Sequence, residues 1–281
     1  MMPRTRAKRT ILGSIGGYVG LVLASAFALL PILWCFSTSL KTANNAVAIP
    51  PQWIPHPATL GNYALVIGSG IPRYFLNSVI VSLLTVLLTL VVAALGGYAA
   101  ARFNFRGKNA VLLGILSTVM VPGVVILVPL YMIASAIHII DTYFVLVLVF
   151  TAWQSPAILW LMRGFFESIP RDMEEAAQID GCTPVGAFVR VILPLAQPGL
   201  AAAAILVFVY VWNEFIIALV LTSSDDMRVL PLGLYFYISA FGVQWGQLTA
   251  AITVAIVPVI AVFVALQRHF VQGLTRGATK G

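Results

Sequence analysis

Six long apolar runs, each about as long as a bilayer is thick, restrict the fold of this chain more than any other feature. An α-helix needs about 20 predominantly apolar residues to cross the hydrocarbon core of a membrane. Runs of this length cover residues 11–36, 75–101, 111–134, 143–162, 199–222 and 248–266. Only 9% of the 281 residues are charged, whereas a soluble domain has about 25%. The sequence therefore predicts an all-α integral membrane protein with six transmembrane helices.

Lysine and arginine residues lie at alternate ends of these runs, which indicates an orientation. Cytoplasmic segments of membrane proteins carry an excess of Lys and Arg. With a cytoplasmic N-terminus, the outer segments contain only three of these 16 residues, Lys41, Arg73 and Arg228. The inner segments contain the other 13, which are Arg4, Arg6, Lys8, Arg9, Arg102, Arg106, Lys108, Arg163, Arg171, Arg190, Arg268, Arg276 and Lys280. We therefore expect both termini in the cytoplasm, and we interpret the net charge of +7 as a topology signal, not as a nucleic-acid-binding surface.

One polar segment, residues 163–198, separates the fourth run from the fifth and has the pattern of folded structure. Five of the nine acidic residues of the chain lie between Glu167 and Asp180. Pro170 suits the first turn of a helix, where its missing N–H costs nothing, and the acidic residues that follow favour a helix N-terminus. Gly181 is suited to end that helix.

A second short helix is expected directly after this glycine. Thr183 is a suitable N-cap, Pro184 suits the first helical position, and Pro194 is expected to end the helix. The polar segment is therefore predicted to form a helix, a glycine bend and a helix on the cytoplasmic side, between the fourth and fifth spans.

The first of these short helices has a face that suits contact with another protein. Met173, Ala176, Ala177 and Asp180 fall at positions i, i+3, i+4 and i+7. A face of mostly small side chains flanked by carboxylates is a poor core, but it fits a groove on a partner with basic residues. The alternative is an amphipathic helix lying on the membrane. The excess of acidic residues argues against this alternative, because the inner leaflet is anionic.

Several motifs together carry a resemblance to a known family. Glu175-Ala-Ala-Gln-Ile-Asp-Gly181, followed by Leu193-Pro194-Leu195, resembles the "EAA" loop of bacterial ABC importer permeases. Further segments resemble motifs of the carbohydrate-importer branch of this family, namely Asn77-Ser78-Val79, residues 98–108, Trp212-Asn213-Glu214-Phe215 and the tail 273–281. The resemblance covers nearly the whole chain and is to the shorter, six-span subunit of maltose-like and glycerol-3-phosphate-like systems. It implies a single permease domain, residues 1–281, in the bacterial cytoplasmic membrane, with residues 163–198 as its coupling loop.

The resemblance also implies partners and site residues. A cytoplasmic ABC ATPase dimer would receive the first short helix, a second permease subunit would complete a heterodimer, and an extracytoplasmic solute-binding protein would deliver a sugar or related solute. Within the coupling loop, Glu175 would meet a basic residue of the ATPase, and Gly181 would allow the bend. The ATPase-coupling residues implied in this way are Glu174, Glu175, Ala176, Ala177, Asp180 and Gly181.

The chain contains no phosphate-binding loop of the form Gly-x-x-x-x-Gly-Lys-Ser/Thr. ATP and Mg²⁺ are therefore expected in the partner ATPase, and no cofactor is expected in this chain. No metal site is expected either, because His56, His138 and His269 are widely separated. Since no nucleophile and base converge in the sequence, the chain is predicted not to be an enzyme.

Glu214 is the only acidic residue expected inside a span, and an intramembrane carboxylate is a functional candidate. With Trp212 and Asn213 it offers an aromatic ring, an amide and a carboxylate, which suit sugar binding, so these three residues are candidates for the solute pathway. Alternatively, Glu214 pairs with Asn213 or with interfacial water.

The alternative function is a subunit of a secondary transporter or channel. Ion coupling requires intramembrane ionisable groups, and only Glu214 is available. Many secondary transporters also have repeated halves, and no clear repeat is visible in this sequence. The sequence therefore favours the permease of an ATP-driven importer.

Overall fold

The computed structural model describes residues 11–239 and 242–278, with side chains described within 16–239 and 242–268. The predicted N-terminal basic residues Arg4, Arg6, Lys8 and Arg9, together with Lys280, lie outside the described residues, as does the end of the tail motif. The chain divides into two compact units. The first unit comprises Met1–Ser69 and Tyr237–Val254, and the second comprises Gly70–Phe236 and Ala255–Gly281.

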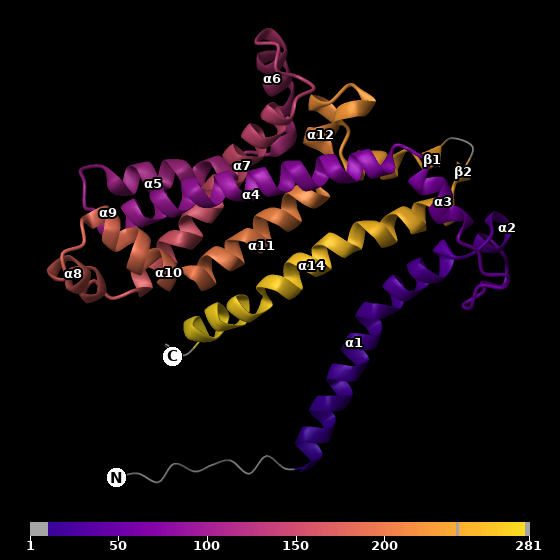
Figure 1. Cartoon of the computed structure of the whole chain (residues 1–281), viewed down its shortest axis with the longest axis horizontal. Helices are drawn as coiled ribbons and strands as arrows, with labels where there is room; N and C mark the ends of the chain where they lie inside the picture. The colour runs from indigo at the N-terminus through magenta and orange to yellow at the C-terminus, as the bar shows by residue number, and fades with distance from the viewer. Residues whose placement is uncertain (1–10, 240–241, 279–281) are drawn as a thin grey trace. The chain divides into compact units, whose positions relative to one another are not determined.

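The first unit contains the first long helix and the segments packed against its end. Its elements are α1 (Ile11–Ser39), α2 (Ala43–Ala46), α3 (Gly61–Ile67), β1 (Ile238–Ser239), β2 (Gly242–Val243) and the first part of α14 (Trp245–Ala278) (Figure 1). The two strands are antiparallel, with Ile238 opposite Val243. Sγ of Cys35 in α1 lies 3.5 Å from the carbonyl oxygen of Thr249 in α14, which places these two helices in contact.

Polar contacts fold the segment after α1 back onto the end of that helix. Nδ2 of Asn62 donates hydrogen bonds to the carbonyl oxygens of Ser39 and Lys41, each at 2.8 Å. Lys41 is buried, and its ammonium group lies 3.9 Å from the centre of the Trp34 ring. Burial lowers the pKa of Lys41 below its ordinary value. The cation–π contact replaces part of the hydration that burial removes.

The second unit is helical and contains the remaining elements. They are α4 (Ile71–Arg102), α5 (Lys108–Ser117), η1 (Thr118–Met120), α6 (Gly123–Ala136), α7 (Tyr143–Ser168), α8 (Asp172–Ile179), α9 (Pro184–Ala187), η2 (Phe188–Ile192), α10 (Leu193–Leu195), α11 (Gln197–Asn213), α12 (Ile216–Leu221), η3 (Asp225–Met227), α13 (Leu230–Tyr235) and the rest of α14. The helices α4, α7 and α11 lie side by side and form the centre of this unit (Figure 1).

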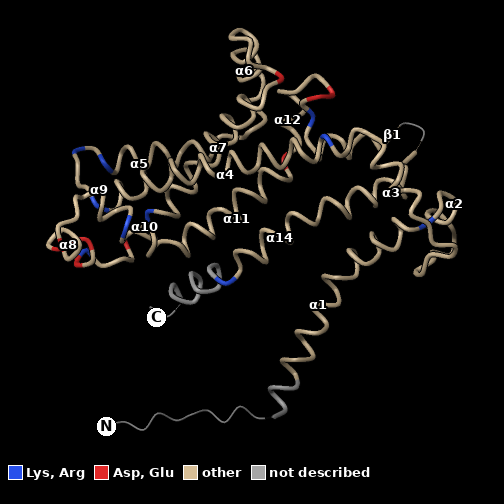
Figure 2. Tube along the Cα trace, in the orientation of Figure 1, with Lys and Arg blue, Asp and Glu red and all other residues tan. Residues whose placement is uncertain are grey.

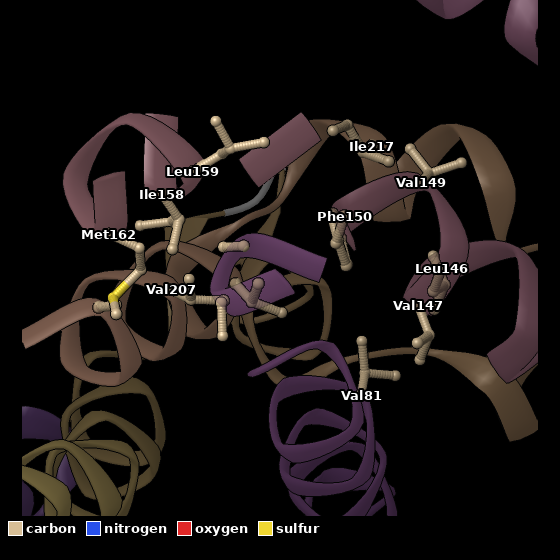
Figure 3. Packing of buried hydrophobic residues seen from close by; sticks show 14 of the residues in the cluster. Val81, Leu146, Val147, Val149, Phe150, Ile158, Leu159, Met162, Val207 and Ile217 are labelled. Carbon is tan, nitrogen blue, oxygen red and sulfur yellow. The ribbon is translucent and has the colours of Figure 1, made fainter. Parts of the chain in front are cut away.

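The core of the second unit lies between these three helices. Apolar side chains from different helices, such as Val81, Phe150 and Val207, are buried there against one another (Figure 3). At Gly97 the backbones of α4 and α7 approach closely, since a Cβ atom at this position would lie 2.9 Å from the backbone nitrogen of Arg163. Small residues permit such close helix packing in membranes, where lipid gives apolar side chains little reason to associate.

The apolar runs appear as helices in most positions where the sequence predicts them. Within the described residues, four helices are long and apolar enough to cross a membrane, namely Gly16–Ser39, Ile71–Arg102, Tyr143–Ser168 and Trp245–Arg268. Two bent pairs of helices raise the number of candidate spans to as many as six. The structure thus confirms a mostly helical protein with four to six candidate spans.

The third predicted run, residues 111–134, is not one straight helix. Lys108–Met120 and Gly123–Ala136 are bent by 96° relative to each other. Pro122 lies at the break, and the residue before it, Val121, is extended with ψ of 123°. Proline disfavours the helical conformation of the preceding residue, which explains why the helix stops here although the apolar run continues.

The fifth predicted run, residues 199–222, is also divided. The helix α11 ends at Asn213, Glu214 is extended with ψ of 126°, and α12 begins at Ile216. Pro194 does not end the second short helix as predicted. It lies in the first turn of α10, where a missing N–H is tolerated, and helical backbone continues to Leu195.

Candidate functional site

The short helix α8 ends in a bend that the sequence predicts correctly. Gly181 has φ of +87°, a left-handed conformation that glycine adopts without strain. Its N–H donates to the carbonyl oxygen of Gln178 at 3.0 Å, and the N–H of Cys182 donates to that of Ala177 at 2.9 Å. These two hydrogen bonds form a Schellman motif, which satisfies carbonyl groups left free at the helix end.

The predicted second helix follows the bend and packs onto the core of the second unit. Oγ1 of Thr183 accepts a hydrogen bond from the N–H of Gly186 at 3.1 Å, which confirms the predicted N-cap. The chain then passes through α9 and the π-helical turn η2. Within that turn, the ring of Phe188 lies 4.4 Å, centre to centre, from the ring of Tyr98 in α4. The segment after the bend is therefore fixed to α4.

The two sides of α8 differ in exposure. Glu174 and Ala177, three residues apart, are buried, whereas Glu175, Ala176 and Asp180 are exposed. The predicted single face is therefore divided, because Ala177 faces the rest of the second unit and Ala176 faces away from it. Figure 2 shows acidic residues gathered at this helix, with Lys and Arg residues close by.

Glu174 has a partner within the chain that the sequence does not indicate. Its Oε2 lies 2.8 Å from Nε of Arg102, at the end of α4, and the two side chains are 11% and 8% exposed. The implied role of Glu174 in contacting the ATPase is therefore at odds with its position, because its carboxylate faces inward. Arg102 is the residue that sequence reasoning missed. The only feature of the sequence that could have indicated an inward-facing Glu174 is its spacing from Ala177, because residues three apart lie on the same side of a helix.

Trp212, the first of the predicted solute-pathway residues, is part of the helix packing. It is 4% exposed, and its Nε1 donates a hydrogen bond to the carbonyl oxygen of Ala255 in α14 at 3.1 Å. Its ring stacks on Phe208 at 5.5 Å and meets the edge of Phe75 at 5.6 Å. In this conformation the indole holds α11 against its neighbours and does not present a face to a sugar.

Asn213 and Glu214 lie at the break between α11 and α12. The carboxylate of Glu214 accepts hydrogen bonds from the N–H groups of Ile216, Ile217 and Ala218, at 3.0 to 3.3 Å. It therefore caps the start of α12, where backbone donors have no partner within the helix. Asn213 is exposed, and its Nδ2 donates to the carbonyl oxygen of Val209 at 2.7 Å. The predicted pairing of Glu214 with Asn213 is not among the hydrogen bonds of the described residues.

Within the described side chains, residues 16–239 and 242–268, no group of three or more His, Cys, Asp or Glu residues is placed to hold a metal ion. The outer side of α8 presents carboxylates and small side chains next to Ile179, which is 86% exposed. Such a mixture suits contact with another protein, in which an apolar centre is bordered by charged groups.

Comparisons with known proteins agree with this description. Residues 92–276 match the family described as "Binding-protein-dependent transport system inner membrane component". The chain is 40% identical to the sulfoquinovosyl glycerol transport system permease protein of Agrobacterium fabrum over 90% of its length and 89% of that protein. It is 37% identical to the trehalose transport system permease protein of Mycobacterium tuberculosis, over 92% of this chain and 95% of that one.

A solved structure has the same fold. It is the crystal structure of a bacterial ABC transporter involved in the import of the acidic polysaccharide alginate. One of its chains superposes with a TM-score of 0.80 at 24% sequence identity, covering 96% of this chain and 100% of that chain.

Proposed function

The chain belongs to the family of binding-protein-dependent transport system inner membrane components, and we propose that it forms one half of the translocation path for a sugar or related solute. Membership confirms the predicted importer permease and a multi-pass membrane protein. ATP hydrolysis in this family belongs to a separate subunit, so the prediction that this chain is not an enzyme is also confirmed. The alternative of a secondary transporter or channel subunit is excluded by the same finding.

The exposed side of α8 is the surface through which an ATPase is proposed to drive transport. Glu175, Ala176 and Asp180 face away from the second unit, while the segments before and after the helix are fixed to α4. A rigidly held helix with an outward carboxylate is suited to enter a groove of an ATPase, where a basic residue would pair with Glu175. Gly181 supports this geometry, because its left-handed conformation turns the chain directly after the docking surface.

The solute class is supported by the relatives. The two relatives described above are named for sulfoquinovosyl glycerol and for trehalose, and both of these contain a sugar. Sugars are recognised by aromatic faces and by groups that bind hydroxyls. In this chain, Asn213 and Glu214 at the break after α11 are the polar candidates for such contacts, and Trp212 would support them from behind.

The membrane arrangement and the remaining partners complete the proposal. Six spans result if each bent helix pair counts as one span, and the distribution of Lys and Arg supports cytoplasmic termini in a bacterial inner membrane. We infer a second, different permease subunit that encloses the path together with this chain. A dimeric ATPase with its own ATP and Mg²⁺ would lie on the cytoplasmic side, and a solute-binding protein on the other.

The substitution Glu175→Ala tests the coupling role. The affinity-tagged chain is extracted from its native membrane, and the ATPase subunit retained with it is quantified. Because the carboxylate would be paired with a basic residue, we expect at least about a tenfold loss of retained ATPase. Asp172→Asn, which changes another exposed carboxylate of the same helix, is the control and should retain the ATPase. Wild-type retention by Glu175→Ala would show that this residue does not contact the ATPase.

A further inference from the structure

Arg102, the last residue of α4, contacts α8 and the segment that leads into it at three points. Its Nε lies 2.8 Å from Oε2 of Glu174. Its Nη2 donates a hydrogen bond to the carbonyl oxygen of Ile169 at 3.0 Å. In turn, Nη2 of Arg171 donates to the carbonyl oxygen of Arg102 at 3.2 Å. The helix α8 is therefore attached to α4, although 69 residues of sequence, 103–171, lie between them.

The chemistry of this attachment favours a positional role over a stabilising one. Both side chains of the ion pair are about nine-tenths buried. A buried ion pair usually adds little stability compared with apolar side chains of similar size, because removing two charges from water is costly. It does position the chain, since one guanidinium pairs with the Glu174 carboxylate by charge and donates a hydrogen bond to the Ile169 carbonyl oxygen. The contact with Glu174 is an ion pair and not a hydrogen bond, because Nε of Arg102 and Oε1 of Glu174 have no hydrogen-bond partner among the described residues. The directional part of the attachment is therefore the hydrogen bond to Ile169, and an apolar contact would have no such directional preference.

The position of Arg102 connects this geometry to the moving part of a permease. Downstream of α8, Phe188 packs on Tyr98, one turn before Arg102 in α4. Gly97, in the same turn, brings α4 into backbone contact with α7. A displacement of α8 therefore acts directly on the end of the α4 and α7 pair.

We propose that Arg102 is a positioning residue that transmits movement of α8 to α4 through its ion pair with Glu174. This inference rests on the proposed function, in which an ATPase moves α8. It assigns different tasks to two adjacent carboxylates. Glu175 faces the ATPase, whereas Glu174 faces Arg102 and passes the displacement into the membrane helices.

The decisive variant replaces both partners, Arg102→Met with Glu174→Met. Removing both charges avoids a lone buried charge, so the protein should fold and keep its ATPase. The measured quantity is the change in fluorescence of an environment-sensitive dye attached at Arg73→Cys, an exposed position at the far end of α4 from Arg102. Cys35 and Cys182 are replaced by serine in this chain, so that the dye attaches at position 73. The native complex, purified with its ATPase and solute-binding partners, is trapped with Mg-ATP and vanadate.

The matched control removes another ion pair in the same way. Arg163→Met with Glu167→Met deletes a pair that lies within α7 alone, at i and i+4, with a distance of 2.7 Å. This pair links no two helices, so the fluorescence change on trapping should equal that of the wild type. For the Arg102 and Glu174 double variant, we expect a change at least about fivefold smaller, with the ATPase still bound.

Three results would overturn the proposal. The first is a wild-type fluorescence change in the double variant. The second is loss of the ATPase from the double variant, because Arg102 would then shape the docking surface and not transmit movement. If the double variant does not accumulate in the membrane, the single variant Arg102→Lys tests the proposal instead. Lysine keeps the positive charge but cannot contact Glu174 and the Ile169 carbonyl oxygen at the same time, as arginine does. A reduced fluorescence change in Arg102→Lys supports the proposal, and a wild-type fluorescence change is the third result that overturns it.

The Glu175→Ala experiment separates this inference from the function on which it rests. If Glu175→Ala releases the ATPase while the double variant behaves as wild type, only the role of Arg102 is wrong. If Glu175→Ala retains the ATPase, the coupling role of the outer side of α8 is wrong.

Discussion

The two ends of α4 are held by different kinds of interaction. At its beginning, Asn77 is 1% exposed, and its Nδ2 donates to the carbonyl oxygens of Asp226 and Arg228 at 2.8 and 2.7 Å. Its Oδ1 accepts a hydrogen bond from the hydroxyl of Tyr143 at 2.6 Å. At its end, Arg102 is held by an ion pair with Glu174 and by one carbonyl oxygen.

This difference separates a static attachment from one that can transmit force. The amide of Asn77 is neutral and uses three hydrogen bonds to tie α4 to α7 and to the segment around η3, so separating these parts would leave the buried amide of Asn77 without its partners. The guanidinium of Arg102 instead joins α4 to a short helix with an exposed outer side. We infer that the beginning of α4 keeps its neighbours fixed, while its end responds to a partner.

The largest expected effect comes from removing the amide at the static end. Asn77→Leu keeps a similar volume but removes the buried donor to the Asp226 and Arg228 carbonyl oxygens and the acceptor of the Tyr143 hydroxyl. We expect a loss of about 3 kcal/mol in the free energy of unfolding, measured by denaturant unfolding in detergent micelles. Tyr143→Phe removes only one of the three hydrogen bonds and should cost about 1 kcal/mol. Equal losses in the two variants would contradict the three-bond attachment.

A smaller, pH-dependent effect is expected at Asp141, in the loop between α6 and α7. Its Oδ1 accepts hydrogen bonds from the N–H groups of Ser223 and Ser224, at 2.9 and 3.1 Å. Burial by itself would raise the pKa of Asp141, but these hydrogen bonds and one with the Ser224 side chain lower it below the ordinary 3.8. The charged carboxylate therefore stabilises the fold above pH 3.8, and this stabilisation is lost as the pH falls through the lower pKa of the folded protein.

Asp141→Asn tests this effect, because Asn tolerates the positive φ of 64° at this position. At neutral pH the variant should be less stable than the wild type by about 1 kcal/mol. Thermal unfolding in detergent, followed from neutral pH into the acid range, should show this difference narrowing below pH 3.8. A difference that widens as the pH falls would contradict the assignment.

The smallest effect is expected at the ion pair of Arg73 and Asp226, at the same end of α4 as Asn77. Its atoms are 2.8 Å apart, but the side chains are 59% and 68% exposed. Arg73→Gln should therefore cost less than about 0.5 kcal/mol, and added salt should reduce the difference further. A loss as large as that of Asn77→Leu would mean that charge, not the neutral hydrogen bonds, holds this end.

The features that the sequence predicts correctly depend on neighbouring residues. Long apolar runs become long helices, Gly181 forms the bend and Thr183 caps the next helix. The features that it does not predict depend on distant contacts. Two adjacent glutamates look alike in sequence, and only the position of Arg102 decides that Glu174 is buried and Glu175 exposed.

The same limit applies to the solute-pathway candidates. The helix α11 is apolar on almost every side, so its sequence has no periodicity that would show that Trp212 faces inward. The break at Pro122 is different, because the restriction that a proline places on the residue before it is local and can be read from the sequence. The size of the bend cannot be read in this way, because the hydrophobic run continues through it.

The backbone contact at Gly97 gives α4 a mechanical consequence. Because no side chain of Gly97 separates α4 from α7 at this point, the close approach of the backbones limits sliding of one helix past the other, and we expect the two helices to move together. A helix of 32 residues is roughly 48 Å long. Tilting such a lever by about 5° around one end carries the other end through roughly 4 Å, close to the width of a sugar ring. A docking movement of a few degrees at Arg102 would thus displace the far end of α4 by a molecular distance, together with the segments that Asn77 holds against it.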